Sequence, residues 1–207
     1  MKKITAVLLI MALAAIFAVS CQKSDKTLIG IAMPETHVLR WVKDGTSLQT
    51  EAVARGYRAE VQYGDANQAT QNTQIQSFLT QDAKALVIGS INDGVASVVS
   101  EANRDGVVVV AYDRIIPNSE DYDYYITFNN FKVGVLQAES IAAGLNLGVV
   151  TSTAPKYITL FAGSPTDGNA FFFFDGAMSV LNPYIKSGAL VVVGPYPETS
   201  EIGRAHV

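Results

Sequence analysis

Residues 106–114 read Gly-Val-Val-Val-Val-Ala-Tyr-Asp-Arg, and this stretch decides the fold. Four consecutive valines predict a strand that is buried on both faces, as in a parallel sheet. An acid and a base, Asp113 and Arg114, follow where that strand ends. Because ligands of open α/β sheets bind beyond the carboxyl ends of the strands, this pair is a candidate binding element. Taken alone, the pair has a second interpretation as a solvated ion pair in a turn.

The chain before this stretch alternates between predicted strands and helices. Apolar runs predict four strands that begin near residues 28, 57, 85 and 107. Apolar residues at helical spacing predict three helices between them. The first helix contains Trp41 and stops at Gly56, and Asn92 caps the third. This alternation indicates right-handed βαβ units and a doubly wound parallel sheet.

After Arg114 the same pattern resumes beyond a polar connection. The expected elements are a strand at 124–128, a helix at 131–145, a strand at 157–162, a helix at 170–181 and a strand at 189–193. We therefore predict an α/β fold of two Rossmann-like lobes with parallel sheets. The first lobe is expected over residues 27–128, and an incomplete second lobe over residues 129–200.

The N-terminal end has the features of an export signal. The chain begins Met-Lys-Lys, residues 4–19 are almost wholly apolar, and small residues precede Cys21. This order is typical of a secretory signal peptide, here residues 1–20, and the apolar stretch is short for a membrane span. Cys21, the only cysteine, resembles the lipidated cysteine of the bacterial lipobox. We expect a lipid anchor on Cys21 and a polar tether over residues 21–26; the alternative is an incidental cysteine beside an ordinary cleavage site.

The last residues of the sequence indicate an origin outside the natural protein. Residues 202–207, Ile-Gly-Arg-Ala-His-Val, match the translation of a widely used sequencing-library adapter. We therefore interpret residues 201–207 as an adapter translation and expect the chain to be a fragment whose natural sequence stops near Ser200. Without His206, His37 is the only remaining histidine.

Composition and motifs argue against several classes of function. The formal net charge is −4 at pH 7, whereas nucleic-acid binding demands basic patches. No Gly-x-Ser-x-Gly motif is present, and a Ser-His-Asp triad would depend on His37 alone. The sequence has no metal-ligand cluster and no glycine-rich phosphate loop, so we expect neither a metal nor a cofactor.

Three loops that follow predicted strands bring polar side chains to one edge of the sheets. In order, these loops carry Glu35, His37, Arg40 and Trp41; then Asp113 and Arg114; then Asp167 and Asn169. Arginine, aspartate and asparagine form planar, bidentate hydrogen bonds, which suits a small ligand with many hydroxyl groups. Trp41 is interpreted either as a stacking platform for a sugar ring or as a core residue. For Asn169, the alternative is a simple cap of the following helix, and for Arg40 a solvated residue at a helix start.

Five motifs occur in the order found in periplasmic sugar-binding proteins of ABC importers. They are Ile-Gly-Ile-Ala-Met (29–33), Leu-Arg-Trp-Val-Lys-Asp (39–44), Val-Ala-Tyr-Asp-Arg (110–114), Phe-Asn-Asn-Phe-Lys-Val-Gly (128–134) and Gly-Ser-Pro-Thr-Asp-Gly-Asn (163–169). Over residues 27–198 the chain resembles these proteins, in particular the D-xylose-binding ones. The resemblance implies two lobes that close on one monosaccharide. It also implies sugar contacts from Arg40, Asp113, Arg114 and Asn169, with Trp41, Asp167 and His37 as secondary candidates.

The chain also departs from the family pattern. Asn129 stands where relatives often have aspartate, beside the first crossing between the lobes. The run Phe171–Phe174 replaces a more mixed sequence, and a helix cannot bury four consecutive residues on one face, so one or two rings should be exposed or face the cleft. The family's remaining contacts come from later loops, so we expect this fragment to bind sugar weakly or not at all.

The resemblance implies a binding protein and not an enzyme. Its expected role is to capture an aldose such as D-xylose and deliver it to the membrane permease of an ABC importer. The expected protein is a monomer, periplasmic or at the cell surface, anchored to the membrane through Cys21 and without a nucleic-acid partner. The alternatives are an exported α/β enzyme acting on a small carbohydrate and a periplasmic sugar sensor for chemotaxis or signalling. A sugar-responsive repressor would need a basic helix-turn-helix where this chain has a signal peptide.

Overall fold

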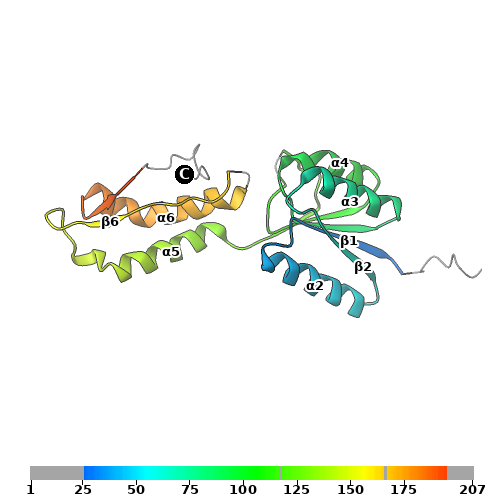
Figure 1. Cartoon of the computed structure of the whole chain (residues 1–207), viewed down its shortest axis with the longest axis horizontal. Helices are drawn as coiled ribbons and strands as arrows, with labels where there is room; N and C mark the ends of the chain where they lie inside the picture. The colour runs from blue at the N-terminus through cyan, green and yellow to red at the C-terminus, as the bar shows by residue number, and fades with distance from the viewer. Residues whose placement is uncertain (1–25, 117, 166, 195–207) are drawn as a thin grey trace, which may run out of the picture.

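The computed structural model describes residues 26–116, 118–165 and 167–194, and Figure 1 shows their course. The predictions for the signal peptide, for lipidation of Cys21 and for residues 201–207 lie outside these ranges. Within them, no helix combines the length and the hydropathy that a membrane crossing requires.

Five parallel strands form the sheet of the first lobe. They are β1 (Leu28–Met33), β2 (Arg58–Tyr63), β3 (Ala85–Ile88), β4 (Val108–Tyr112) and β5 (Tyr124–Ile126). Their order is β2-β1-β3-β4-β5, and every neighbouring pair is parallel. The prediction of a doubly wound parallel sheet is confirmed. Because all five strands run the same way, the loops that follow them meet at one edge of the sheet.

Helices cover the two faces of this sheet unequally. α2 (Leu39–Ala54) lies on one face, and α3 (Gln68–Thr80) and α4 (Ala96–Arg104) lie on the other (Figure 1). A short 3-10 turn (Asp93–Val95) leads into α4, and Asn92 caps it as predicted, accepting a hydrogen bond of 2.9 Å from the backbone N–H of Gly94.

The valine run is only partly buried, which corrects the prediction that both faces of its strand are covered. Val109 is fully buried, but Val108 on the opposite face is 40% exposed. α2 packs on β1 and β2, so the same face of β4 and β5 has less cover. Tyr124 and Ile126, which lie on β5, are exposed. The described residues therefore leave one apolar face of β4 and β5 open.

The second lobe contains two helices and a second parallel sheet. Its elements are α5 (Asn130–Gly144), a 3-10 turn (Leu147–Val149), β6 (Lys156–Ile158), α6 (Gly168–Lys186) and β7 (Leu190–Val192). β6 is shorter than the strand predicted at 157–162 because its partner β7 pairs with three residues only. α6 is longer than the helix predicted at 170–181 and continues through Pro183.

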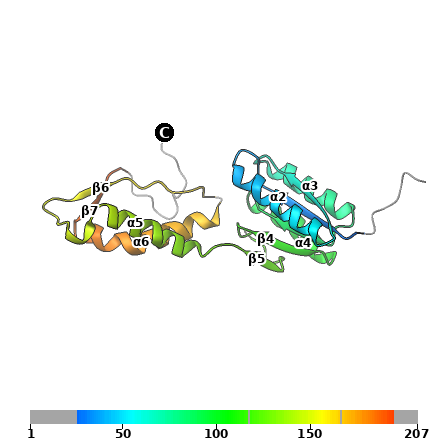
Figure 2. The same cartoon turned by 90° about the horizontal axis from the view of Figure 1, so that it is seen from below.

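α5 and α6 lie side by side with their backbones in contact (Figures 1 and 2). A Cβ atom at Gly134 would overlap the carbonyl oxygen of Phe173, and one at Gly176 would overlap that of Phe131. Two glycines therefore allow this close approach. Phe172 is exposed and the other three rings of its run are half-buried, which confirms that the run is not buried on one helix face.

Candidate functional site

Asp113 has an unusual backbone conformation at the end of β4. Its φ angle is 63°, in the left-handed region that non-glycine residues rarely occupy and that aspartate tolerates better than most. Its N–H donates to the carbonyl of Ile126 at 2.7 Å. Its own carbonyl accepts from Thr127 Oγ1 at 2.8 Å, Asn169 Nδ2 at 3.0 Å and Tyr125 Oη at 3.3 Å. These hydrogen bonds fix the direction in which the Asp113 side chain points.

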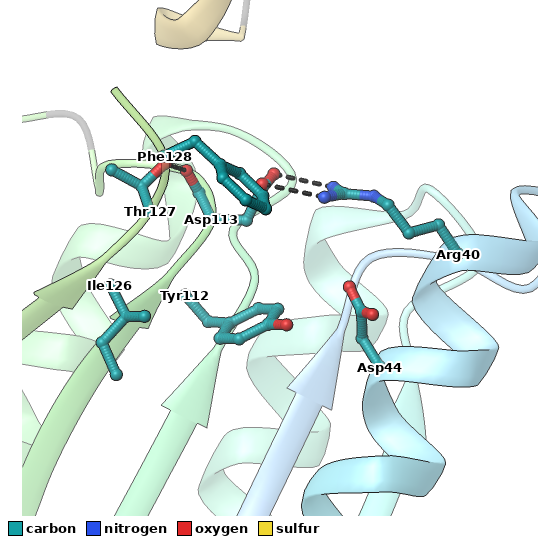
Figure 3. A pocket seen from close by; sticks show the side chains of 7 residues that line it. All are labelled: Arg40, Asp44, Tyr112, Asp113, Ile126, Thr127 and Phe128. Atoms are coloured by element: carbon teal, nitrogen blue, oxygen red, sulfur yellow. Dashed lines mark hydrogen bonds and ion pairs between the residues drawn. The ribbon is translucent and has the colours of Figure 1, made fainter. Parts of the chain in front are cut away.

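The Asp113 carboxylate forms a bidentate pair with Arg40, at the start of α2 (Figure 3). Arg40 Nη1 donates to Oδ1 at 2.9 Å, and Nη2 donates to Oδ2 at 2.8 Å. Two parallel bonds between planar groups are the strongest form of such a contact. Hydrogen bonding to Asp113 raises the pKa of Arg40, although burial opposes the shift. The structure thus brings together two predicted site residues that are 73 positions apart.

Arg114 points away from Asp113 and toward the second lobe. Its Nη1 donates to the carbonyl of Ser90 at 3.2 Å, and its Nε lies 3.3 Å from Asp167 Oδ2. The other carboxylate oxygen of Asp167 accepts from the N–H of Asn169 at 3.0 Å and caps α6. Asp167 is therefore the cap, which corrects the alternative that gave this role to Asn169.

Trp41 is a core residue that supports both arginines. Only 2% of its surface is exposed, so the ring is not open to stacking by a ligand. The Cζ atom of Arg40 lies 4.2 Å from the ring centroid, and that of Arg114 lies 5.3 Å from it. Both distances are within the range of cation–π attraction. The core interpretation of Trp41 is the one that fits, and the indole adds a platform for two guanidinium groups.

His37 is the predicted site residue that the structure leaves outside this cluster. Its side chain is exposed, and its Nδ1 lies 3.9 Å from Glu35 Oε2. Among the described residues, no three His, Cys, Asp or Glu side chains are grouped closely enough to hold a metal ion.

A cavity of about 380 Å³ lies between the lobes. Its polar lining comes from Arg40, Asp113, Asn130, Asp167 and Asn169, and its apolar lining from Phe128, Val133 and Phe173. The volume falls in the lower part of the roughly 300–1,000 Å³ range of small-molecule sites. Charged and amide groups beside aromatic rings can hold a ligand that has both hydroxyl groups and an apolar face.

Sequence reasoning missed the cavity residues Phe128, Asn130 and Val133, and it expected one or two rings of Phe171–Phe174 to be exposed or face the cleft without identifying Phe173. Phe128 was assigned to the end of a strand, but β5 ends at Ile126, and this leaves the ring 68% exposed in the loop. The signal that could have found it is the rule that ligands lie beyond strand ends. No local pattern distinguishes Phe173 from the phenylalanines beside it.

A second cavity of about 250 Å³ lies beside the first, with the Arg40–Asp113 pair lining both. Asp44, Tyr112 and Ile126 extend its lining along α2, β4 and β5 (Figure 3). Burial, followed by the negative charge of Asp44, raises the pKa of the Tyr112 hydroxyl. Tyr112 therefore stays protonated, and neutral, over the physiological pH range.

The fold and this cleft agree with a known family. Residues 29–204 match the periplasmic binding protein domain. The chain belongs to the periplasmic binding protein family. The resemblance that the five sequence motifs predicted is confirmed at this level, together with the fold class.

Individual relatives agree with this membership. The multiple sugar-binding periplasmic receptor ChvE of Rhizobium radiobacter is 46% identical, over 91% of this chain and 53% of its own length. The D-xylose-binding periplasmic protein of Escherichia coli K12 is 40% identical, over 80% of this chain and 48% of its own. A solved ABC transporter solute-binding protein from Clostridium phytofermentans, with bound β-D-glucose, has a TM-score of 0.77 and 41% identity, covering 80% of this chain and 51% of that one.

The chain spans about half the length of the relatives it matches. These relatives bear the names of solute-binding proteins and not of enzymes, in agreement with the expectation from the sequence.

Proposed function

We propose that this protein binds one monosaccharide between its two lobes and delivers it to the membrane permease of an ABC importer. The single observation that carries the proposal is the bidentate Arg40–Asp113 pair on the wall of the interlobe cavity. A hydroxyl group both donates and accepts hydrogen bonds. A carboxylate that only accepts and a guanidinium that only donates therefore suit neighbouring hydroxyls of one sugar ring.

The other candidate contacts follow from the same cavity. Arg114, between Ser90 and Asp167, contributes a second positive charge near the cleft. Asn169 reaches the cavity from the second lobe, and one Nδ2 hydrogen remains after its bond to Asp113. Phe128 and Phe173 replace Trp41 as the surfaces on which the apolar face of a sugar packs.

The chemical class of ligand is an aldose, with D-xylose or a similar sugar as the specific proposal. Relatives named for D-xylose, for multiple sugars and for bound β-D-glucose support this class. The proposal extends to export through the signal peptide at residues 1–20, a lipid anchor at Cys21, a monomeric state, and a division between lobes near residue 129. The permease subunits and the membrane are then its partners.

Titration calorimetry of the full-length gene product tests the proposal. D-xylose, D-ribose, D-glucose, D-galactose and L-arabinose are titrated separately, and at least one is expected to bind at a single site. Asp113→Asn should weaken that binding about 10- to 150-fold, because a hydrogen bond to a charged group contributes roughly 1.5–3 kcal/mol. Absence of binding to all five sugars would reject the proposed ligand class.

Asp82→Asn is the matched control. Asp82 has a φ angle of 64°, almost the same backbone conformation as Asp113, and it pairs with Lys84 on the surface. Asparagine tolerates the left-handed region, so both variants keep their backbone. Equal affinities of the two variants would show that Asp113 does not contact the sugar.

A further inference from the structure

The N-terminal end of α6 contacts the turn after β4 through two side chains. Asn169 Nδ2 donates to the carbonyl of Asp113 at 3.0 Å, and Asp167 Oδ2 lies 3.3 Å from Arg114 Nε. The two residues of the second lobe thus contact two consecutive residues of the first. We call these four residues the interlobe clasp. One contact is a hydrogen bond and the other an ion pair, and because both join different lobes, they are lost when the lobes separate.

The Asn169 amide is held in the orientation that the clasp needs. Its Oδ1 accepts from Asn130 Nδ2 at 2.8 Å, and Asn130 Nδ2 also donates to Thr127 Oγ1 at 3.2 Å. Asn169 is 4% exposed and Asn130 is 7% exposed. Since Oδ1 faces the donor of Asn130, Nδ2 must face the carbonyl of Asp113. A buried amide without these partners would be unfavourable, which explains why the side chain is oriented in this way.

We propose that Asn169 is a positioning residue that couples lobe closure to the conformation of Asp113. Opening removes one of the three donors that hold the Asp113 carbonyl, and thereby loosens the carboxylate that faces Arg40. In the closed state the clasp stabilises the arrangement before any sugar arrives. The inference rests on the proposed function only for its effect on affinity; its effect on closure does not need a sugar.

The expected loss of affinity follows from the shift between the open and closed populations. The apparent dissociation constant equals the intrinsic constant divided by the fraction of molecules that are closed. Losing one neutral hydrogen bond, which contributes roughly 0.5–1.5 kcal/mol, lowers that fraction about two- to sevenfold when the open and closed states are equally populated without sugar. Asn169→Ala should therefore weaken sugar binding by at least this factor and increase the radius of gyration of the sugar-free protein.

Thr127→Val is the comparison variant, because it removes another donor to the same carbonyl from within the first lobe, together with the 3.2 Å bond that Asn130 donates to Thr127 Oγ1. Valine has nearly the shape of threonine, and the Asn169–Asp113 bond remains, so the variant should weaken sugar binding through Asp113 and open the sugar-free protein less than Asn169→Ala does. Asn169→Asp is the second variant, since it keeps an oxygen for Asn130 but loses the donor to Asp113. It should open the sugar-free protein as Asn169→Ala does.

The test uses the full-length gene product. Small-angle X-ray scattering is measured without sugar, and calorimetry then uses the sugar that binds best in the five-sugar panel. The inference is supported if both Asn169 variants scatter as more open molecules than the wild type and than Thr127→Val. Wild-type scattering from both Asn169 variants overturns it, and so does an equal opening by Thr127→Val. If no sugar binds, the proposed function fails while scattering still decides whether the clasp exists.

Discussion

The backbone contact between α5 and α6 gives a prediction that is independent of the ligand. Gly134 and Gly176 face each other's helices, and a Cβ atom at either would overlap a backbone carbonyl oxygen of the opposite helix. A backbone carbonyl cannot rotate away as a side chain can, so Gly134→Ala must push the helices apart. We expect this substitution to destabilise the second lobe.

The magnitude follows from two opposing terms. Alanine gains up to about 1 kcal/mol over glycine from helix propensity. Overpacking typically costs about 1–3 kcal/mol, and more where the neighbours cannot move. The control is Gly144→Ala at the end of the same helix, where nothing lies within 4 Å of the new Cβ. Gly144→Ala has the same gain in helix propensity and no overlap, so the two variants should differ in free energy of unfolding by the overpacking cost, about 1–3 kcal/mol or more.

Urea unfolding followed by circular dichroism measures this difference, with the midpoint and slope compared between variants. A second readout is sugar affinity. Phe173 lines the interlobe cavity and also supplies the carbonyl that Gly134→Ala would displace. Affinity should therefore fall for Gly134→Ala and stay unchanged for Gly144→Ala. Free energies of unfolding within about 0.5 kcal/mol of each other would refute the helix contact.

Three further predictions concern the cleft and its tyrosines. Trp41→Leu should weaken sugar binding about 2- to 30-fold, since cation–π contacts with Arg40 and Arg114 contribute roughly 0.5–2 kcal/mol. Trp41→Phe should recover part of that loss in the same calorimetric assay. Arg40→Lys should weaken binding about tenfold because an ammonium group cannot make both bonds to Asp113, whereas Arg55→Lys, in an exposed pair with Glu51, should bind as the wild type. Burial raises the pKa of Tyr112 and of Tyr125 above the ordinary value of 10.0, so the folded state favours their protonated forms. Unfolding free energy should fall as the pH rises above about 10, and Tyr→Phe substitutions at both positions should flatten that fall in urea titrations across pH.

Much of the fold could be predicted because its signals are local. The spacing of apolar runs located each strand of the first lobe, and Asn92 marked the start of a helix. The prediction that Val108 is buried was wrong. Four valines that look alike in sequence meet different neighbours on the two faces of the sheet. Which helix packs over which strand is a tertiary property. The predicted bounds of β6 were wrong for the same reason, since a strand ends where its pairing partner ends.

The site was harder to predict than the fold. The adjacent residues Asp113 and Arg114 were interpreted as one pair, yet β4 ends at Tyr112 and the left-handed backbone at Asp113 sends the two side chains to different partners. Asp113 accordingly reaches Arg40, and Arg114 reaches Asp167. The left-handed φ angle of Asp113 depends on hydrogen bonds from distant residues. No pattern in the run of valines contains that information.

Asp113 contacts residues of both lobes, because its carboxylate and its backbone carbonyl face different partners. Its carboxylate is held by Arg40 within the first lobe, and its carbonyl is shared by Thr127 of that lobe and Asn169 of the other. The carbonyl belongs to the backbone, so no substitution at position 113 removes it. A substitution at position 113 therefore changes the ligand contact of the carboxylate and keeps the carbonyl that accepts from Asn169. A substitution at Asn169 changes both, because its amide also reaches the cavity, so sugar preference and the balance between open and closed states are coupled at Asn169.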